Sequence, residues 1–290
     1  MDTQVIQWNE PNRANTPPLH IASRGDRYST VTGVWWLDEF RFVANHRSGL
    51  RLALFDMREG LAPVTTVAVP HLSDDVAARP LGGDSWELAV SGCWDASHSV
   101  YRLDCEGGSR FSLIASHPAP NRSFCHGVAY DQTGRLCLTY HTGEDPRILI
   151  GDQLTRLPPP WGARDICHDQ DQDKYHAVAV SNNPQRTAYQ STSMSVWSLL
   201  PSSGTWDQTL NIDNVHSDAC QMFRGRLWVP DQAGDRVLGL DLSQDKPPIV
   251  IQGDCLDFPH GLSISRRGML AVTSYGSSSI VLLDVSSASN

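Results

Sequence analysis

The sequence predicts an all-β protein, a six-bladed β-propeller of four-stranded blades, on three observations. Short segments rich in β-branched and aromatic residues alternate with turns containing Gly, Asn or Asp, and the clearest unit, residues 258–285, has no segment typical of a helix. One strand pattern recurs six times at intervals of about 46 residues, which suits one propeller blade. The last repeat lacks a fourth strand, while an apolar segment near the N-terminus has no partner of its own. The second strands of the six repeats end at Asn45, Gly92, Tyr140, Asn182, Asp231 and Ser274.

The repeating unit is clearest over residues 258–285, where three short strands are separated by turns containing Gly and Ser. Residues 123–152 repeat the same order: a His-Gly pair, an apolar strand, a turn ending in Gly, a second strand, a turn and a third strand. A two-sheet sandwich is the alternative architecture, but it requires neither the regular spacing nor an unpaired first strand.

Ring closure is predicted to involve the N-terminal segment. We expect residues 19–24 (LHIASR) to form the outer strand of the last blade, because an open edge there would be a hazard for unwanted pairing. Pro17 and Pro18 just before it suit an edge strand. Residues 1–16 then form an N-terminal arm, and residues 17–290 a single propeller domain.

Composition excludes several functions. A formal net charge of -9 without any basic run argues against nucleic-acid binding. No window approaches the roughly 20 apolar residues of a membrane span, and the first residues lack the apolar core of a signal peptide, so we expect a cytoplasmic monomer without a membrane partner. The seven cysteines are an odd number without C-x-x-C spacing, which favours reduced thiols.

Histidines precede a small residue at three places where the chain is expected to enter an innermost strand: His126-Gly127, His216-Ser217 and His260-Gly261. The small residue lets the strand approach the crowded axis, and neutral imidazoles around a channel suit zinc, iron or manganese. The pattern therefore predicts a site in which these three histidines hold a metal ion, with Asp165 as a candidate fourth ligand.

The register of the second histidine stays open. Eight residues separate His126 from the turn glycine Gly134, but nine separate His216 from Gly225, so either His216 or Ser217 faces the channel.

Loops between second and third strands should reach the same face as these histidines. Their polar and aromatic side chains are candidates to move protons during catalysis. They are Tyr140, His141, Asp231 and Tyr275.

The unit at residues 259–285 resembles the repeats of six-bladed propellers of the NHL, SMP-30/gluconolactonase and strictosidine-synthase-like group. In the gluconolactonase branch a metal-binding Asn or Asp often precedes the glycine, where this chain has His126 and His260. Thr32-Gly33, rather than a Glu, enters the first blade. The histidines are more similar to the amidating-lyase branch, and this resemblance implies zinc held by three histidines.

These observations together predict a metal-dependent lyase or hydrolase that acts on a small or peptide-derived molecule in the central channel. One divalent ion is expected, zinc before iron or manganese, and calcium fits least well. The alternative is a non-catalytic scaffold that binds a protein or peptide on the same face through Trp94, Tyr140 and Tyr275.

Overall fold

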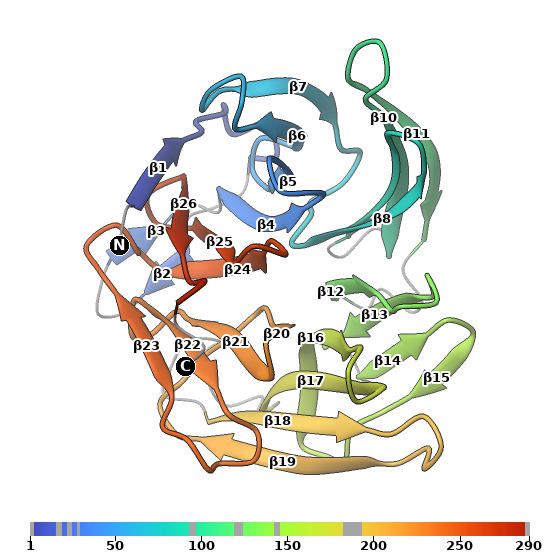
Figure 1. The fold of residues 1–290 in the computed structure, drawn as a ribbon, viewed down its shortest axis with the longest axis vertical. Helices are drawn as coiled ribbons and strands as arrows, with labels where there is room; N and C mark the ends of the chain where they lie inside the picture. Colours follow the sequence, from blue (N-terminus) through green and yellow to red (C-terminus); the bar gives the residue numbers. More distant parts are fainter. Residues whose placement is uncertain are drawn as a thin grey trace.

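The computed structural model describes residues 3–15, 19–21, 25–27, 30–92, 97–118, 124–141, 146–181 and 193–287. These residues form six four-stranded antiparallel sheets and one two-stranded sheet, with no helix among them. The described part of the chain thus has no helix long and apolar enough to cross a membrane. The six sheets surround a central axis as blades, which confirms the six-bladed propeller (Figure 1).

Each blade runs outward from the axis in four strands, and blades 1 to 6 are numbered here in chain order. The innermost strands are β4 (Val31–Trp36), β8 (Val76–Gly82), β12 (Cys125–Tyr130), β16 (Trp161–Asp169), β20 (Gln221–Phe223) and β24 (Pro259–Ile264). The second strands are β5 (Arg41–His46), β9 (Ser85–Ser91), β13 (Leu136–Tyr140), β17 (Lys174–Ser181), β21 (Arg226–Asp231) and β25 (Met269–Ser274).

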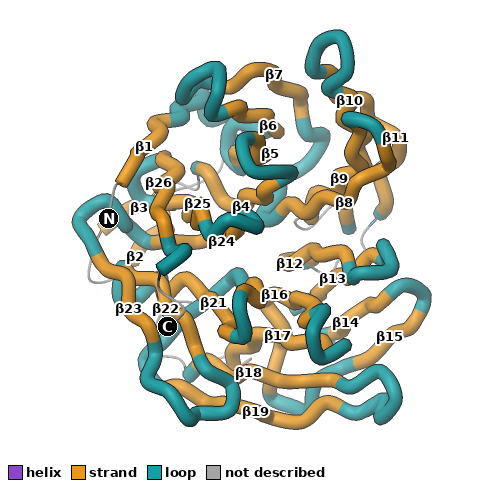
Figure 2. The backbone as a smooth tube through the Cα atoms, viewed as in Figure 1, coloured by secondary structure: helices purple, strands orange, loops and turns teal. Residues whose placement is uncertain are grey.

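The outer half of each blade has two further strands, and loops join the outermost strands of blades 1, 3, 4 and 5 to the next blade (Figure 2). The third strands are β6 (Arg51–Asp56), β10 (His98–Asp104), β14 (Arg147–Ile150), β18 (Met194–Leu199), β22 (Arg236–Leu240) and β26 (Ser279–Asp284). The outermost strands are β7 (Pro63–Ala68), β11 (Arg110–His117), β15 (Gln153–Thr155), β19 (Trp206–Ile212), β23 (Ile249–Gln252) and, for blade 6, β1 (Thr3–Gln7).

An N-terminal strand closes the ring, as expected, but it is not the segment expected. β1 pairs antiparallel with β26, with Thr3 opposite Leu283. β2 (Leu19–Ile21) pairs instead with β3 (Gly25–Arg27), so the assignment of residues 19–24 to the last blade is wrong. The physical reason lies in the side chains of the earlier segment: Ile6 and Trp8 are 2% and 4% exposed and pack between blades 6 and 1.

The hydrophobic core is divided among the blade interfaces. Side chains of a strand alternate between its two faces, so each blade packs against both neighbours. Six clusters of buried residues result, one at each interface between adjacent blades. Burial of one large apolar side chain contributes about 1.5 to 3 kcal/mol, so these clusters are the main source of stability.

Two threonines also link neighbouring blades beside the axis. Thr139 Oγ1 accepts a hydrogen bond from Gly127 N and donates one to the carbonyl of Arg164 in the next blade, both at 2.8 Å. Thr273 Oγ1 in blade 6 links Gly261 N to the carbonyl of Thr32 in blade 1, both at 2.7 Å. We call these two arrangements the threonine links.

The threonine links draw the inner strands close together. A Cβ added to Gly127 would meet the Asp165 side chain and would lie 2.6 Å from Asp165 Cα. A Cβ added to Gly261 would meet the Thr32 carbonyl oxygen. The close approach of the next blade therefore requires a glycine after His126 and after His260, as the sequence predicts.

Candidate metal centre

Six side chains, one from each blade at or just before its innermost strand, interact around the axis. We call them the channel ring. Five of them are buried, and the arginine side chain is 13% exposed. The channel ring consists of Thr32, Asp74, His126, Arg164, Asp218 and His260.

Backbone hydrogen bonds identify which residue of blade 5 belongs to the ring. Three equivalent carbonyls accept from the loop after the second strand: Phe124 O from His141 N, His216 O from Gln232 N, and Phe258 O from Tyr275 N. His216 therefore takes the place of Phe124 and Phe258. Asp218, two residues later, takes the place of His126 and His260.

Asp218 lies between three imidazoles. Its Oδ1 is 3.7 Å from His126 Nε2 and 3.4 Å from His216 Nε2, and its Oδ2 is 3.5 Å from His260 Nε2. Ligand atoms of His126, Asp218 and His260 all lie within 4.8 Å of one another, and all three residues are buried. The structure thus brings two of the predicted histidines together with a carboxylate, and the third, His216, contacts that carboxylate through Oδ1.

Burial and charge determine the protonation states. Burial lowers the pKa of His126 to about 4, although the charges of Asp218 and Asp74 oppose this shift. Burial alone would raise the pKa of Asp218, but His126 and Arg164 outweigh it and hold that pKa well below its ordinary value. At neutral pH the centre therefore presents neutral imidazoles and an ionised carboxylate, the forms that bind a metal.

The hydrogen bonds of these residues fit a metal. His260 Nδ1 lies 3.3 Å from the Thr32 carbonyl, which can only accept, so the proton is on Nδ1 and the lone pair of Nε2 is available. Gln232 Nε2 donates to Asp218 Oδ2 at 2.8 Å, whereas Oδ1 has only longer contacts, with His216 Nε2 at 3.4 Å and with Arg164 Nε at 3.7 Å. Two imidazoles and one carboxylate are a donor set known for zinc and for non-haem iron.

Asp165 lies outside this group, in the interface between blades 3, 4 and 5. Its Oδ2 accepts a hydrogen bond from Cys220 N at 2.7 Å. Burial, together with the charge of Asp75, raises the pKa of Asp165 well above its ordinary value. A carboxyl group that is bonded to the backbone and holds its proton more tightly than usual is a poorer metal ligand than the Asp218 carboxylate.

Two of the candidate proton-transfer residues form hydrogen bonds within the scaffold. The hydroxyl of Tyr140 lies 2.5 Å from Ser97 Oγ, and burial raises its pKa to about 12. Asp231 Oδ1 accepts from His216 N at 3.3 Å and Oδ2 from Arg236 Nε at 2.8 Å.

The other two candidates contact the ring. His141 meets His126 edge to face, with ring centroids 5.1 Å apart, and Arg164 Nη1 lies 2.8 Å from His141 Nε2. Tyr275 stacks on His260, with centroids 5.3 Å apart and planes 17° from parallel. Both side chains therefore help to orient the histidines of the candidate centre.

Sequence reasoning missed Asp218, Asp74 and Gln232. Asp74 Oδ2 lies 3.9 Å from His126 Nε2, and its Oδ1 pairs with Arg47. A usable signal existed for Asp74 alone. Asp74-Asp75 and Arg164-Asp165 place an acidic residue at equivalent points of blades 2 and 4, since Asp75 accepts from Val128 N at 3.0 Å in the way that Asp165 accepts from Cys220 N.

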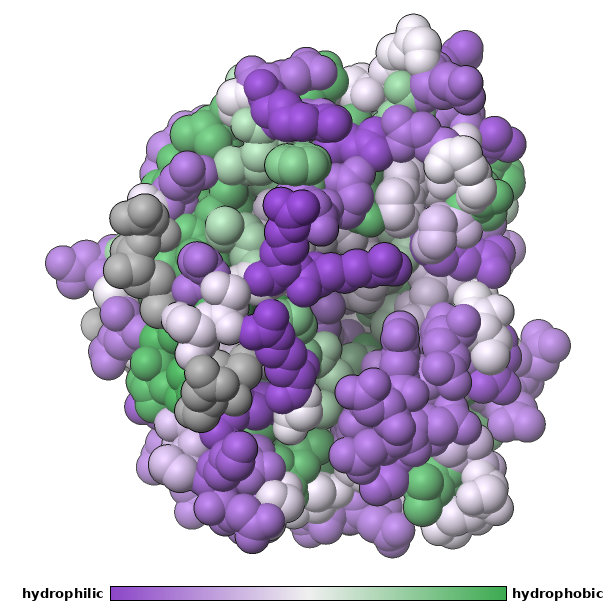
Figure 3. Space-filling view, viewed as in Figure 1, coloured by the Kyte–Doolittle hydropathy of each residue, from purple (hydrophilic) through white to green (hydrophobic). Residues whose placement is uncertain are grey.

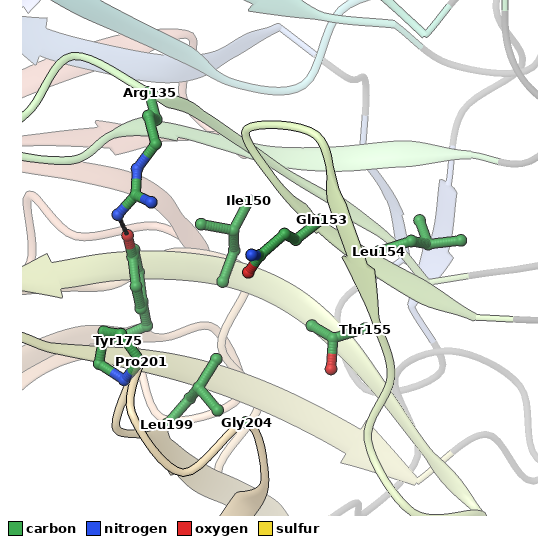
Figure 4. Close-up of a pocket in the computed structure, with 9 residues that line it drawn as sticks. All are labelled: Arg135, Ile150, Gln153, Leu154, Thr155, Tyr175, Leu199, Pro201 and Gly204. Atoms are coloured by element: carbon green, nitrogen blue, oxygen red, sulfur yellow. Dashed lines mark hydrogen bonds between the residues drawn. The ribbon is translucent and has the colours of Figure 1, made fainter.

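A pocket of about 380 Å³ lies away from the ring, between blades 3 and 4 (Figure 4). Arg135 Nη2 donates to the Tyr175 hydroxyl at 2.7 Å on one side of it. The lining residues are Arg135, Ile150, Gln153, Leu154, Thr155, Tyr175, Leu199, Pro201 and Gly204.

On the face of the protein seen in Figure 3, strongly hydrophilic side chains gather near the centre.

The chain matches no family model and no curated protein. Solved structures share its fold. A luciferin-regenerating enzyme is 11% identical with a TM-score of 0.63, covering 97% of this chain and 95% of its own. A streptogramin B lyase is 12% identical with a TM-score of 0.56, covering 97% and 98%. A chain of a nidogen/laminin complex is 14% identical with a TM-score of 0.62, covering 90% of this chain and 98% of its own.

This protein is a six-bladed propeller, a class that includes enzymes and proteins found in complexes with other proteins, so its function has to be argued from its site.

Proposed function

We propose that this protein is a metal-dependent enzyme, a lyase or hydrolase, acting on a small or peptide-derived molecule in the central channel. One observation carries the proposal: His126, Asp218 and His260 offer ligand atoms within 4.8 Å of one another at the axis of the propeller. A fold that needed only a structural core would place apolar side chains there, since burial of charged groups is costly unless they are paired or bind a metal.

The residues around the centre have separate roles in this proposal. His126, Asp218 and His260 would hold one divalent ion, zinc or iron by their donor set, which would polarise a substrate oxygen or acidify water. Tyr275 and Thr32 orient His260, and Gln232 orients Asp218. His141 positions Arg164 beside the centre: its Nε2 accepts from Arg164 Nη1 at 2.8 Å, and burial together with the charge of Arg164 holds its pKa well below 6.5, so the imidazole stays neutral.

The same geometry argues against the scaffold alternative. Of the aromatic residues expected to form a docking surface, Tyr140 is 4% and Tyr275 is 1% exposed. Trp94 lies outside the described residues. Buried rings that support polar residues do not form a surface for a protein partner.

Metal content tests the proposal. Protein stripped with a chelator is dialysed against zinc, iron, manganese or calcium, and elemental analysis follows removal of the excess. We expect close to one zinc or iron per chain, and well below stoichiometric metal in His126→Ala. His71→Ala is the matched control, because His71 is also buried but its Nε2 bonds Ser99 Oγ on the third strand of blade 2. Metal-free wild-type protein under all four conditions would overturn the proposal.

A further inference from the structure

Two ion pairs flank the candidate metal centre. Arg164 Nε lies 3.7 Å from Asp218 Oδ1, and Arg47 Nη1 pairs with Asp74 Oδ1 at 2.5 Å. The Arg164 side chain is 13% and the Arg47 side chain 16% exposed, so both charges are largely buried next to carboxylates of the channel ring. Without a metal, the two guanidinium groups balance the two carboxylates.

A divalent ion would change this balance. Histidine ligands are neutral when they bind a metal, and the carboxylates of Asp74 and Asp218 are already balanced by Arg47 and Arg164, so the ion adds two positive charges that have no counter-charge. A buried site with excess positive charge is favourable only when an anion joins it, because buried charges require partners. The loaded centre should therefore attract a negatively charged ligand.

Arg164 is the residue placed to bind that anion. Its Nη1 is held against His141 Nε2 at 2.8 Å, whereas its Nε has no hydrogen-bond partner among the described residues. Once Asp218 binds a metal, its attraction for the guanidinium weakens. A planar guanidinium held by one nitrogen is suited to bind an oxyanion with the others.

We propose, on the basis of the function proposed above, that the substrate carries an anionic oxygen group, a carboxylate or a phosphate, which Arg164 binds beside the metal. Arg164 thereby selects acids over neutral molecules of the same shape. His141 is its positioning residue, since it holds the guanidinium toward Asp218 and His126.

Cobalt-loaded protein tests this inference without a need for substrate. The visible absorption of the bound cobalt reports ligands that enter its surroundings, so the wild-type protein is titrated with acetate, methyl phosphate and acetamide. We expect acetate or methyl phosphate to bind and acetamide, the neutral analogue of acetate, to bind much more weakly. The tighter of the two anions identifies the acid group.

The variant Arg164→Gln should weaken binding of the anion about tenfold or more, as expected for loss of a hydrogen bond between charged groups, with cobalt content unchanged. Arg164→Lys keeps the charge and should lose less; it also serves if Arg164→Gln does not fold. Arg102→Gln is the control, since Arg102 pairs with Asp104 on the outer part of blade 2.

The outcomes separate the two proposals. Wild-type protein that binds no cobalt overturns the proposed function, and this inference with it. Cobalt bound with equal affinity for acetate and acetamide, or with an anion affinity that neither Arg164 variant changes, overturns this inference alone.

Discussion

Blades 3 and 6 bring a histidine to the channel by the same local design, whereas blade 5 reaches the channel by a different one. His126 and His260 are each the second residue of a six-residue innermost strand, and each is followed by a glycine that a threonine link secures. In blade 5 the innermost strand begins only at Gln221, three residues after Asp218.

The difference has a cause in the sequence of blade 5. Pro230 stands where blades 3 and 6 have Thr139 and Thr273, as the pairing of the second and third strands shows. Proline has no hydroxyl, so no threonine link forms, and Ala219 replaces the glycine. The segment before β20 is therefore not part of a strand, and it places the Asp218 carboxylate next to the imidazoles of His126 and His260.

The largest loss of stability is expected at the N-terminal segment, which supplies the outermost strand of blade 6. Blade 3 has no such dependence, because its outermost strand β15 directly follows β14. Trp8→Ala should lower the free energy of unfolding by about 3 to 5 kcal/mol, because Trp8 packs against His46 and Phe55 and is 4% exposed. Chemical denaturation measures the change. Val5→Ala on the preceding strand β1, where the side chain is 39% exposed, should cost less than about 1 kcal/mol. Equal costs for the two variants would contradict the assignment of the closing strand.

Gly127 of blade 3 should not tolerate a side chain, whereas blade 5 already has Ala219 at the equivalent position. Gly127→Ala places a methyl group against Asp165 and 2.8 Å from the Arg164 carbonyl oxygen, so we expect a loss of about 3 kcal/mol in unfolding free energy. Ala219→Gly, the reciprocal change, should cost about 1 kcal/mol or less. A Gly127→Ala protein as stable as the wild type would show that the blades do not approach as described.

His176, a buried histidine outside the channel ring, provides a reference for how the folding stability depends on pH. Burial lowers the pKa of His176 to about 4, below its unfolded value of about 6.5. Between these values the unfolded chain binds a proton that the folded chain does not, so stability is complete above about pH 6.5 and falls as the pH drops toward 4. From pH 7 to pH 5 this histidine should account for about 2 kcal/mol.

The check is urea denaturation with a chelator present at both pH values. His176→Gln should lose about 2 kcal/mol less than the wild type over this range. An identical loss in both proteins would mean that His176 is accessible to protons in the folded state.

Smaller and equal effects are expected at the two threonine links. Thr139→Val and Thr273→Val keep the shape but leave a backbone N–H and a carbonyl without their partner, at a cost of about 1 to 2 kcal/mol each. Thr66→Val on the exposed outer strand β7 should be neutral within about 0.5 kcal/mol. Thermal or urea unfolding of the three variants decides whether the links contribute equally, as the similarity of blades 3 and 6 requires.

The fold was accessible to sequence reasoning because strand alternation and turn residues are local signals that recur in each blade. Five of the six second strands end within one residue of the predicted position, and the sixth predicted end, Asn182, lies outside the described residues. The closing strand was misassigned because pairing between β1 and β26 depends on tertiary packing of Ile6 and Trp8, and the strand-like residues 19–24 offered a competing pattern.

The site was predicted only as far as the repeat is regular. His126 and His260 could be placed on the channel from the glycine that follows each. Asp218 could not, because counting back from Gly225 assumes a full-length strand, and β20 has three residues. The contribution of Arg164 depends on a contact with His141, a residue of another blade, which no local pattern contains.

The most direct test of the account compares Asp218→Asn with His216→Ala in a zinc-affinity measurement by competition with a chelating indicator. The account predicts that Asp218→Asn weakens zinc binding more than about a hundredfold, because a ligand is lost, and that His216→Ala weakens it by about tenfold, as for a residue that only supports a ligand. Circular dichroism verifies that both variants fold. A larger loss in His216→Ala than in Asp218→Asn would contradict the assignment of the carboxylate as the third ligand.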